Sequence, residues 1–137
     1  MIKQVLFNKS LKIEKNGKVN WLKHQFFKRI FYLISKFSPE LVDYKINNIS
    51  IKIPPKHVLP FFLRKVPQYS MNVGRVAKIC MNKYPDGIII DIGANIGDTA
   101  AIIRSHLVKN KIISVEGVRQ FYDVLKVNAN LLKNITT

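Results

Sequence analysis

The sequence is poor in cysteine and has no long apolar run. Cys80 is the one cysteine in 137 residues, so neither an internal disulfide nor a cysteine-based zinc cluster can form. A reducing, cytoplasmic setting fits this composition. No stretch of about 18 apolar residues is present, and the apolar run at residues 1–7 is too short for a secretory signal. The sequence therefore predicts neither a membrane-spanning segment nor a disulfide-stapled scaffold.

Acidic residues are also scarce, with eight Asp and Glu against 23 Lys and Arg, for a net charge of +15. Residues 1–84 carry 17 basic and three acidic residues, a net charge of +14, whereas residues 85–137 are close to neutral at +1. A basic region of this kind can attract nucleic acid, an anionic membrane surface or an anionic glycan, or can be a solvated surface.

The remaining composition is that of a folded protein, because 47% of the residues are hydrophobic. The length suits one domain. We expect three segments, which are a basic arm with an amphipathic helix (1–43), a lead-in of strand, loop and helix (44–84), and a βαβα unit (85–137).

Within the basic arm, residues 1–20 show no clear periodicity and predict an irregular segment. Residues 21–37 predict a basic amphipathic helix, whose apolar positions recur at helical spacing: Leu22, Phe26, Ile30, Leu33 and Phe37. Such a helix could make weak contact with an anionic membrane, which would place the protein at its periphery, or could pack on protein. Its aromatic residues suit helical burial better than base stacking, which disfavours nucleic acid as the partner.

The lead-in changes from alternating to helical periodicity. Alternation of Ile49, Ile51 and Ile53 predicts a strand that follows a turn or bulge at Asn47-Asn48. Residues 57–67 contain two prolines and predict loop and short extended segments. The next apolar positions recur at helical spacing and predict a helix that ends near residue 83.

The last segment alternates short apolar runs with helical patterns. Residues 88–90 are all isoleucine and predict a strand buried on both faces of a parallel sheet. A helix over 98–109, a second strand over 112–115 and a final helix should follow. Strand, helix, strand and helix at these lengths predict an α/β fold.

The candidate site is the turn between the first of these strands and its helix, with the sequence Asp91-Ile92-Gly93-Ala94-Asn95-Ile96-Gly97-Asp98. In an open α/β sheet, ligands bind at this carboxyl edge of the strands. Gly93 and Gly97 allow a tight turn and a close approach of the backbone to a ligand. Glu116 ends the second strand, where a carboxylate can accept hydrogen bonds from ribose hydroxyls.

Two nucleoside cofactors could use this layout. A dinucleotide fingerprint starting at Gly93 would need glycine at positions 95 and 98, which are Asn95 and Asp98. A carboxylate at the helix start would repel a pyrophosphate. S-adenosylmethionine carries an ammonium and a sulfonium instead, which suit nearby carboxylates such as Asp91. The residues favour S-adenosylmethionine, with an NAD-dependent oxidoreductase and a basic nucleic-acid-binding or membrane-binding module as the alternatives.

Over residues 44–137 the sequence resembles the FkbM family of methyltransferases. The resemblance rests on the runs IDIGANIGDT (90–99), SVEG (114–117) and NAN (128–130), and on the prolines of the lead-in. It implies the N-terminal part of a Rossmann-like class I methyltransferase fold, preceded by a basic helical and short β lead-in. It also implies methyl transfer from S-adenosylmethionine to a hydroxyl oxygen of a sugar or glycan. The residues that would bind the cofactor are Asp91, Gly93, Ala94, Asn95, Gly97, Asp98 and Glu116.

Two predicted strands bury little core, and the family's sheet needs more of them. The sheet is therefore expected to be incomplete and the 137-residue chain to be inactive alone. No catalytic base can be named, although His57 could border a substrate site. Nothing in the sequence resembles a metal site, a nucleophile–base pair or a P-loop.

Overall fold

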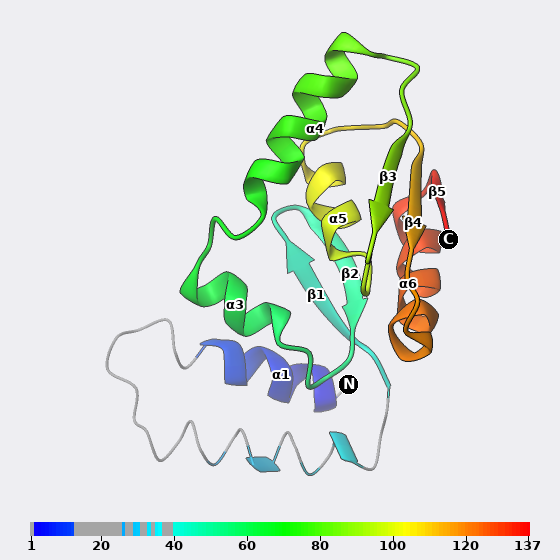
Figure 1. Cartoon of the computed structure of the whole chain (residues 1–137). Coiled ribbons are helices and arrows are strands. Elements are labelled where there is room, and N and C mark those ends of the chain that lie inside the picture. Colours follow the sequence, from blue (N-terminus) through cyan, green and yellow to red (C-terminus); the bar gives the residue numbers. More distant parts are fainter. Residues whose placement is uncertain (1, 13–25, 27–28, 31–32, 34, 37–39) are drawn as a thin grey trace.

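The computed structural model describes residues 2–12, 26, 29–30, 33, 35–36 and 40–137 (Figure 1). The predicted helix over residues 21–37 falls largely outside the described residues. The described elements are α1 (Ile2–Lys12), β1 (Val42–Ile46), β2 (Ile49–Ile53), α3 (Leu59–Lys65), α4 (Met71–Lys83), β3 (Ile89–Ile92), α5 (Asp98–Ser105), β4 (Ile112–Val115), α6 (Arg119–Leu132) and β5 (Ile135–Thr136).

The fold is mixed α/β, as predicted, with a three-stranded parallel sheet in the order β3-β4-β5. In the register of this sheet Ile112 of β4 lies between Ile89 and Ile135. Helices α5 and α6 connect consecutive strands, as parallel pairing requires. The two-residue β5 is too short to leave a pattern, and the sequence did not predict it.

Among the described residues, helices cover only one face of this sheet. Apolar side chains of α4 and α5, such as Ala77 and Ile103, pack against the same cluster as Ile89, Ile112 and Ile135. Side chains of a strand alternate between faces, so the other face carries Ile90, which is 63% exposed, and Ile92, which is 82% exposed. The prediction of a strand buried on both faces is therefore wrong, because an all-apolar run does not reveal how many layers of helix lie over it.

This asymmetry predicts very different costs for the same substitution in two strands. Ile112→Thr places a hydroxyl among fully buried side chains and should lower the free energy of unfolding by about 2 kcal/mol or more. Ile92→Thr changes an exposed side chain and should stay within about 0.5 kcal/mol. Urea unfolding followed by circular dichroism measures both. Equal costs would mean that both faces of the sheet are covered in solution.

The lead-in forms an antiparallel hairpin of β1 and β2, in which Ile46 pairs with Ile49. The turn residues Asn47-Asn48 are confirmed, and Asn47 has the positive φ, +52°, that two-residue hairpins favour. Buried side chains of this hairpin share one hydrophobic core with α5 and α6: Val42, Ile46, Ile51, Ile53, Ile96, Ala101, Ile102 and Val124.

Two helices occupy segments predicted to be irregular. Residues 2–12 form α1, and its Lys3, Phe7 and Ser10 are buried at positions that share one helix face. Residues 59–65 form α3, in which Pro60 lies in the first turn, where a missing N–H costs nothing. The predictions of irregular structure are wrong over these two ranges, because a short buried face in α1 and a proline in the first turn of α3 leave no clear helical periodicity. The predicted end of the following helix near Lys83 is confirmed.

Candidate functional site

The loop between β3 and α5 folds into a tight turn at the carboxyl edge of the sheet. Gly93, Asn95 and Gly97 all have positive φ angles, of +79°, +50° and +86°. The N–H groups of Gly93 and Ala94 both donate to the carbonyl oxygen of Val115, at 2.9 and 3.0 Å. These bonds tie the loop to the end of the neighbouring strand, where the motif was predicted to lie.

Glu116 lies against this loop and links it to the start of α6. Its Oε2 accepts a hydrogen bond from the backbone N–H of Asn95 at 2.8 Å, and its Oε1 accepts one from Val118 at 2.7 Å. Each carboxylate oxygen can accept more than one hydrogen bond. Glu116 can therefore hold the turn in place and still accept hydrogen bonds from ligand hydroxyl groups.

Two carboxyl groups, those of Asp91 and Asp98, lie at the base of the turn. Burial raises the pKa of Asp91, and the negative charge of Asp98 raises it further. The Oδ2 atom of Asp91 is buried and has no hydrogen-bond partner among the described residues. Burial also raises the pKa of Asp98, against the opposing effects of a hydrogen bond from its own backbone N–H and of the nearby His57. A cationic ligand placed here would satisfy the buried oxygen and favour both ionised carboxylates.

The glycines of the turn differ in what surrounds them. A Cβ atom added to Gly93 would meet no atom within 4 Å, so the space beside this residue is open to a ligand. A Cβ atom added to Gly97 would lie 3.0 Å from Cδ1 of Leu125 in α6. Ala94 is buried. The first glycine therefore leaves room beside the turn, and the second allows α6 to pack closely on it.

His57 of the lead-in also lies at the site. The sequence suggested that it could border a substrate site but assigned it no role. Its Nδ1 accepts from the N–H of Leu59, so its Nε2 donates to Oδ1 of Asn95, both at 3.3 Å. The ring of Phe121 meets it edge-on, with 6.4 Å between ring centroids. No spacing signal in the sequence could have found this contact, because the two residues of the hydrogen bond are 38 positions apart.

Asn128 of α6 is a second residue that sequence reasoning did not assign to the site. Its side chain is fully buried and makes three hydrogen bonds. Oδ1 accepts from the N–H of Lys52 at 2.7 Å, and Nδ2 donates to the carbonyl oxygens of Lys52 and Ile96 at 2.8 and 2.7 Å. Asn128 thus fixes the hairpin and the motif loop to the same helix.

The structure brings all seven predicted cofactor residues to this one edge of the sheet. Comparisons with family models, with curated proteins and with solved structures found no match to the chain. The part of the chain that the structure describes holds no group of three or more His, Cys, Asp or Glu residues that could bind a metal ion. Cofactor binding by these residues therefore stays a prediction that rests on their own geometry.

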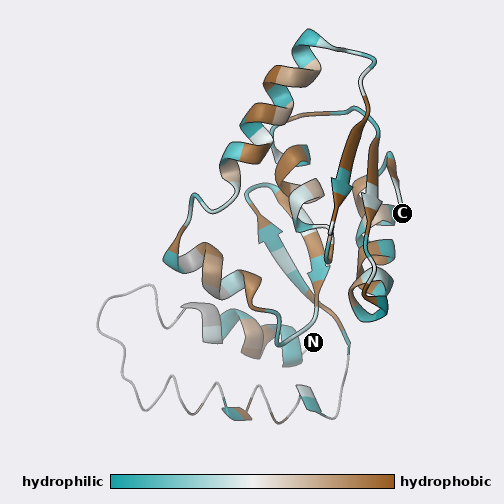
Figure 2. Cartoon of the chain, in the orientation of Figure 1, coloured by the Kyte–Doolittle hydropathy of each residue, from teal (hydrophilic) through white to brown (hydrophobic). Residues whose placement is uncertain are grey.

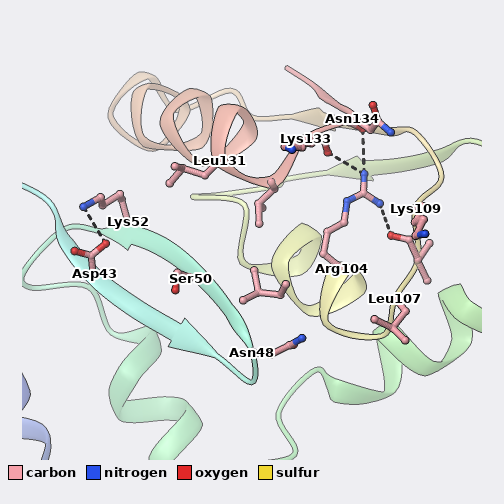
Figure 3. A pocket seen from close by; sticks show the side chains of 13 residues that line it. Asp43, Asn48, Ser50, Lys52, Arg104, Leu107, Lys109, Leu131, Lys133 and Asn134 are labelled. Atoms are coloured by element: carbon pink, nitrogen blue, oxygen red, sulfur yellow. Dashed lines mark hydrogen bonds and ion pairs between the residues drawn. The ribbon is translucent and has the colours of Figure 1, made fainter.

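A separate hollow of about 790 Å³ lies between the hairpin and the C-terminal ends of α5 and α6 (Figure 3). Its central cation, Arg104, donates to the carbonyl oxygens of Val108, Lys133 and Asn134, and burial lowers its pKa. Lys52 at the rim pairs with Asp43 at 2.9 Å. Lys109 and Lys133 also line the hollow, which is a junction of helix ends and contains no residue of the motif.

Proposed function

We propose that the chain binds S-adenosylmethionine at the β3–α5 turn and that its α/β fold is of the Rossmann-like methyltransferase type. The observation that carries the proposal is the pair of carboxyl groups, Asp91 and Asp98, beside an open glycine turn. Asp91 has a buried oxygen for which the described part of the chain supplies no partner. This arrangement suits a ligand that presents positive charge to the loop.

The residues at the turn fit the parts of this cofactor. Asp91 and Asp98 would neutralise its positive charge, and Glu116 would accept hydrogen bonds from its ribose hydroxyl groups. Asn95 is held from both sides, by Glu116 at its N–H and by His57 at its side chain, which positions the turn before a ligand arrives. When bound, the cofactor supplies a methyl group on a sulfonium. The acceptor, a hydroxyl oxygen of a sugar or glycan, follows from the resemblance to the FkbM family.

The same arrangement argues against a dinucleotide. A pyrophosphate needs backbone N–H groups at a helix N-terminus and no neighbouring negative charge. Here the first residue of α5 is Asp98, whose carboxyl group already lies close to a second one. An anionic ligand would therefore have to displace or neutralise two carboxylates before binding.

The proposal is tested by calorimetric titration of the chain with S-adenosylhomocysteine, with NADH as a competitor. We expect saturable binding that NADH does not displace. Glu116→Ala removes the acceptor for ribose and for the N–H of Asn95, and should weaken binding by about 10-fold or more. Asp123→Ala is the matched control, because Asp123 is an exposed residue that pairs with Arg119 on the outside of α6.

Preferential binding of NADH would contradict the proposal and favour an oxidoreductase. Absence of binding by a chain that unfolds cooperatively would remove the cofactor from the proposal altogether. Equal losses in Glu116→Ala and Asp123→Ala would show that the loop between β3 and α5 is not the binding site.

A further inference from the structure

Helices α3 and α4 and the turn between them carry an unusual number of exposed apolar side chains. Over residues 58–84, seven of them are at least 45% exposed: Val58, Phe62, Val66, Tyr69, Val76, Ile79 and Tyr84. The rings of Phe62 and Tyr69 lie together, with 5.7 Å between their centroids. We call the exposed side chains of residues 58–84 the α3–α4 surface.

The same stretch of sequence has no negative charge. Between Asp43 and Asp86 there are eight Lys and Arg residues and no Asp or Glu. Lys65, Arg75 and Lys78 are exposed on the α3–α4 surface, and none has an acidic partner among the described residues. Apolar side chains and unneutralised cations therefore share one surface.

The two kinds of side chain are interleaved in α4. Val76 and Ile79 lie three residues apart on the outer side of the helix, and Arg75 and Lys78 each directly precede one of them. In Figure 2 hydrophobic and hydrophilic segments alternate along this helix. Figure 1 shows α3 and α4 along the side of the molecule opposite to α6, and the site residues of α6 are not part of this surface.

We propose that the α3–α4 surface docks on an anionic membrane. Apolar and aromatic side chains of an interfacial helix enter the boundary between headgroups and acyl chains, while Lys and Arg attract anionic lipids. The complete lack of acidic residues over 44–85 matches a partner of negative charge. Phe62 and Tyr69 could stack on bases, but nucleic acid suits this surface less well than a membrane, because Val76 and Ile79 on α4 offer no ring.

The proposed contact lies on the outer side of α3 and α4, and no helix among the described residues is both long and apolar enough to cross a membrane. It also differs from the helix that the sequence predicts over residues 21–37. The α3–α4 surface shares no residue with the carboxyl groups of the β3–α5 turn, so membrane docking and cofactor binding can be tested separately.

The test is flotation of the full chain with phosphatidylcholine vesicles that do or do not contain phosphatidylserine. We expect binding to the anionic vesicles alone, weakened by added salt. Lys78→Glu should reduce that binding roughly 10-fold or more, because it replaces an attraction to anionic lipids by a repulsion. Ile79→Ser should also reduce it, since it removes an apolar side chain that would enter the interface.

Two residues of α6 supply matched controls. Lys126 and Val127 are consecutive and exposed, as Lys78 and Ile79 are in α4. Lys126→Glu and Val127→Ser should leave vesicle binding unchanged, which separates a local surface from an effect of net charge. Glu116→Ala should also leave it unchanged, so that failure of cofactor binding and failure of membrane docking remain distinguishable. Circular dichroism checks that each variant is folded.

Several results would overturn the proposal. They are absence of binding to anionic vesicles, equal binding to neutral vesicles, and equal losses in the α4 and α6 variants. Binding that survives Lys78→Glu and Ile79→Ser but is lost in Phe26→Ser would assign the membrane contact to residues 21–37 instead. Binding of single-stranded RNA that Lys78→Glu abolishes, without vesicle binding, would replace the membrane by nucleic acid as the partner.

Discussion

Asp91→Asn should stabilise the ligand-free chain and at the same time weaken its binding of S-adenosylhomocysteine by about 10- to 100-fold. The aspartate is partly buried and lies near Asp98, and both effects raise its pKa. Its negative charge therefore lowers the free energy of unfolding. Removing the charge relieves that cost by on the order of 1 kcal/mol, or several degrees in Tm. The cationic group of the ligand then loses a charged partner.

The dependence on pH gives a second measurement of the same group. A carboxyl group whose pKa is raised by folding binds its proton more tightly in the folded than in the unfolded state. Its destabilising effect is therefore complete above the raised pKa, decreases as the pH falls below that value, and is absent below the ordinary pKa of the unfolded chain. Affinity for a cationic ligand should decline over the same range. In Asp91→Asn both dependences should be flatter than in the unchanged chain.

Asp86→Asn is the control for these measurements, because Asp86 is an exposed aspartate in the turn before β3. It should alter neither the Tm nor the binding of S-adenosylhomocysteine. Thermal unfolding followed by circular dichroism and calorimetric titration measure the two quantities. A lower Tm with unchanged affinity in Asp91→Asn would mean that the carboxylate serves the fold and not a ligand.

Asn128→Ala should lower the free energy of unfolding by about 3 kcal/mol or more, a larger loss than we expect for Ile112→Thr. The substitution removes the Asn128 partner of three backbone groups, namely the part-buried N–H and carbonyl of Lys52 and the buried carbonyl of Ile96. It also opens a cavity between the hairpin and α6. Because Ile96 belongs to the motif loop, binding of S-adenosylhomocysteine should weaken as well.

Two further variants separate hydrogen bonding from volume. Asn128→Leu fills the space again but still leaves the same three groups unsatisfied, so it should not restore stability. Asn130→Ala changes an exposed asparagine of the same helix and should stay within about 0.5 kcal/mol. Urea unfolding of the three variants measures these differences. Recovery of stability in Asn128→Leu would show that packing and not hydrogen bonding decides at this position.

The second half of the chain was the more predictable. Strands at Ile89–Ile92 and Ile112–Val115 and the helices after them were expected from short β-branched runs and helical periodicity. The predicted helix over 98–109 is shorter in the structure and ends at Ser105. In the first half, the helices at Ile2–Lys12 and Leu59–Lys65 were missed, because their stability comes from contacts that residues distant in sequence provide.

The residues of the candidate site also fall into a group that the sequence predicted and a group that only the structure revealed. The sequence by itself determined the glycine turn and the carboxyl groups of Asp91, Asp98 and Glu116, because short-range spacing from a strand end places such residues at one edge of a sheet. Only the tertiary structure decided that His57 reaches Asn95 and that Asn128 holds the loop. It also decided that helices cover one face of the sheet and leave the other exposed. Contacts between residues that are tens of positions apart depend on how the elements pack, and the local periodicity of the sequence does not predict them.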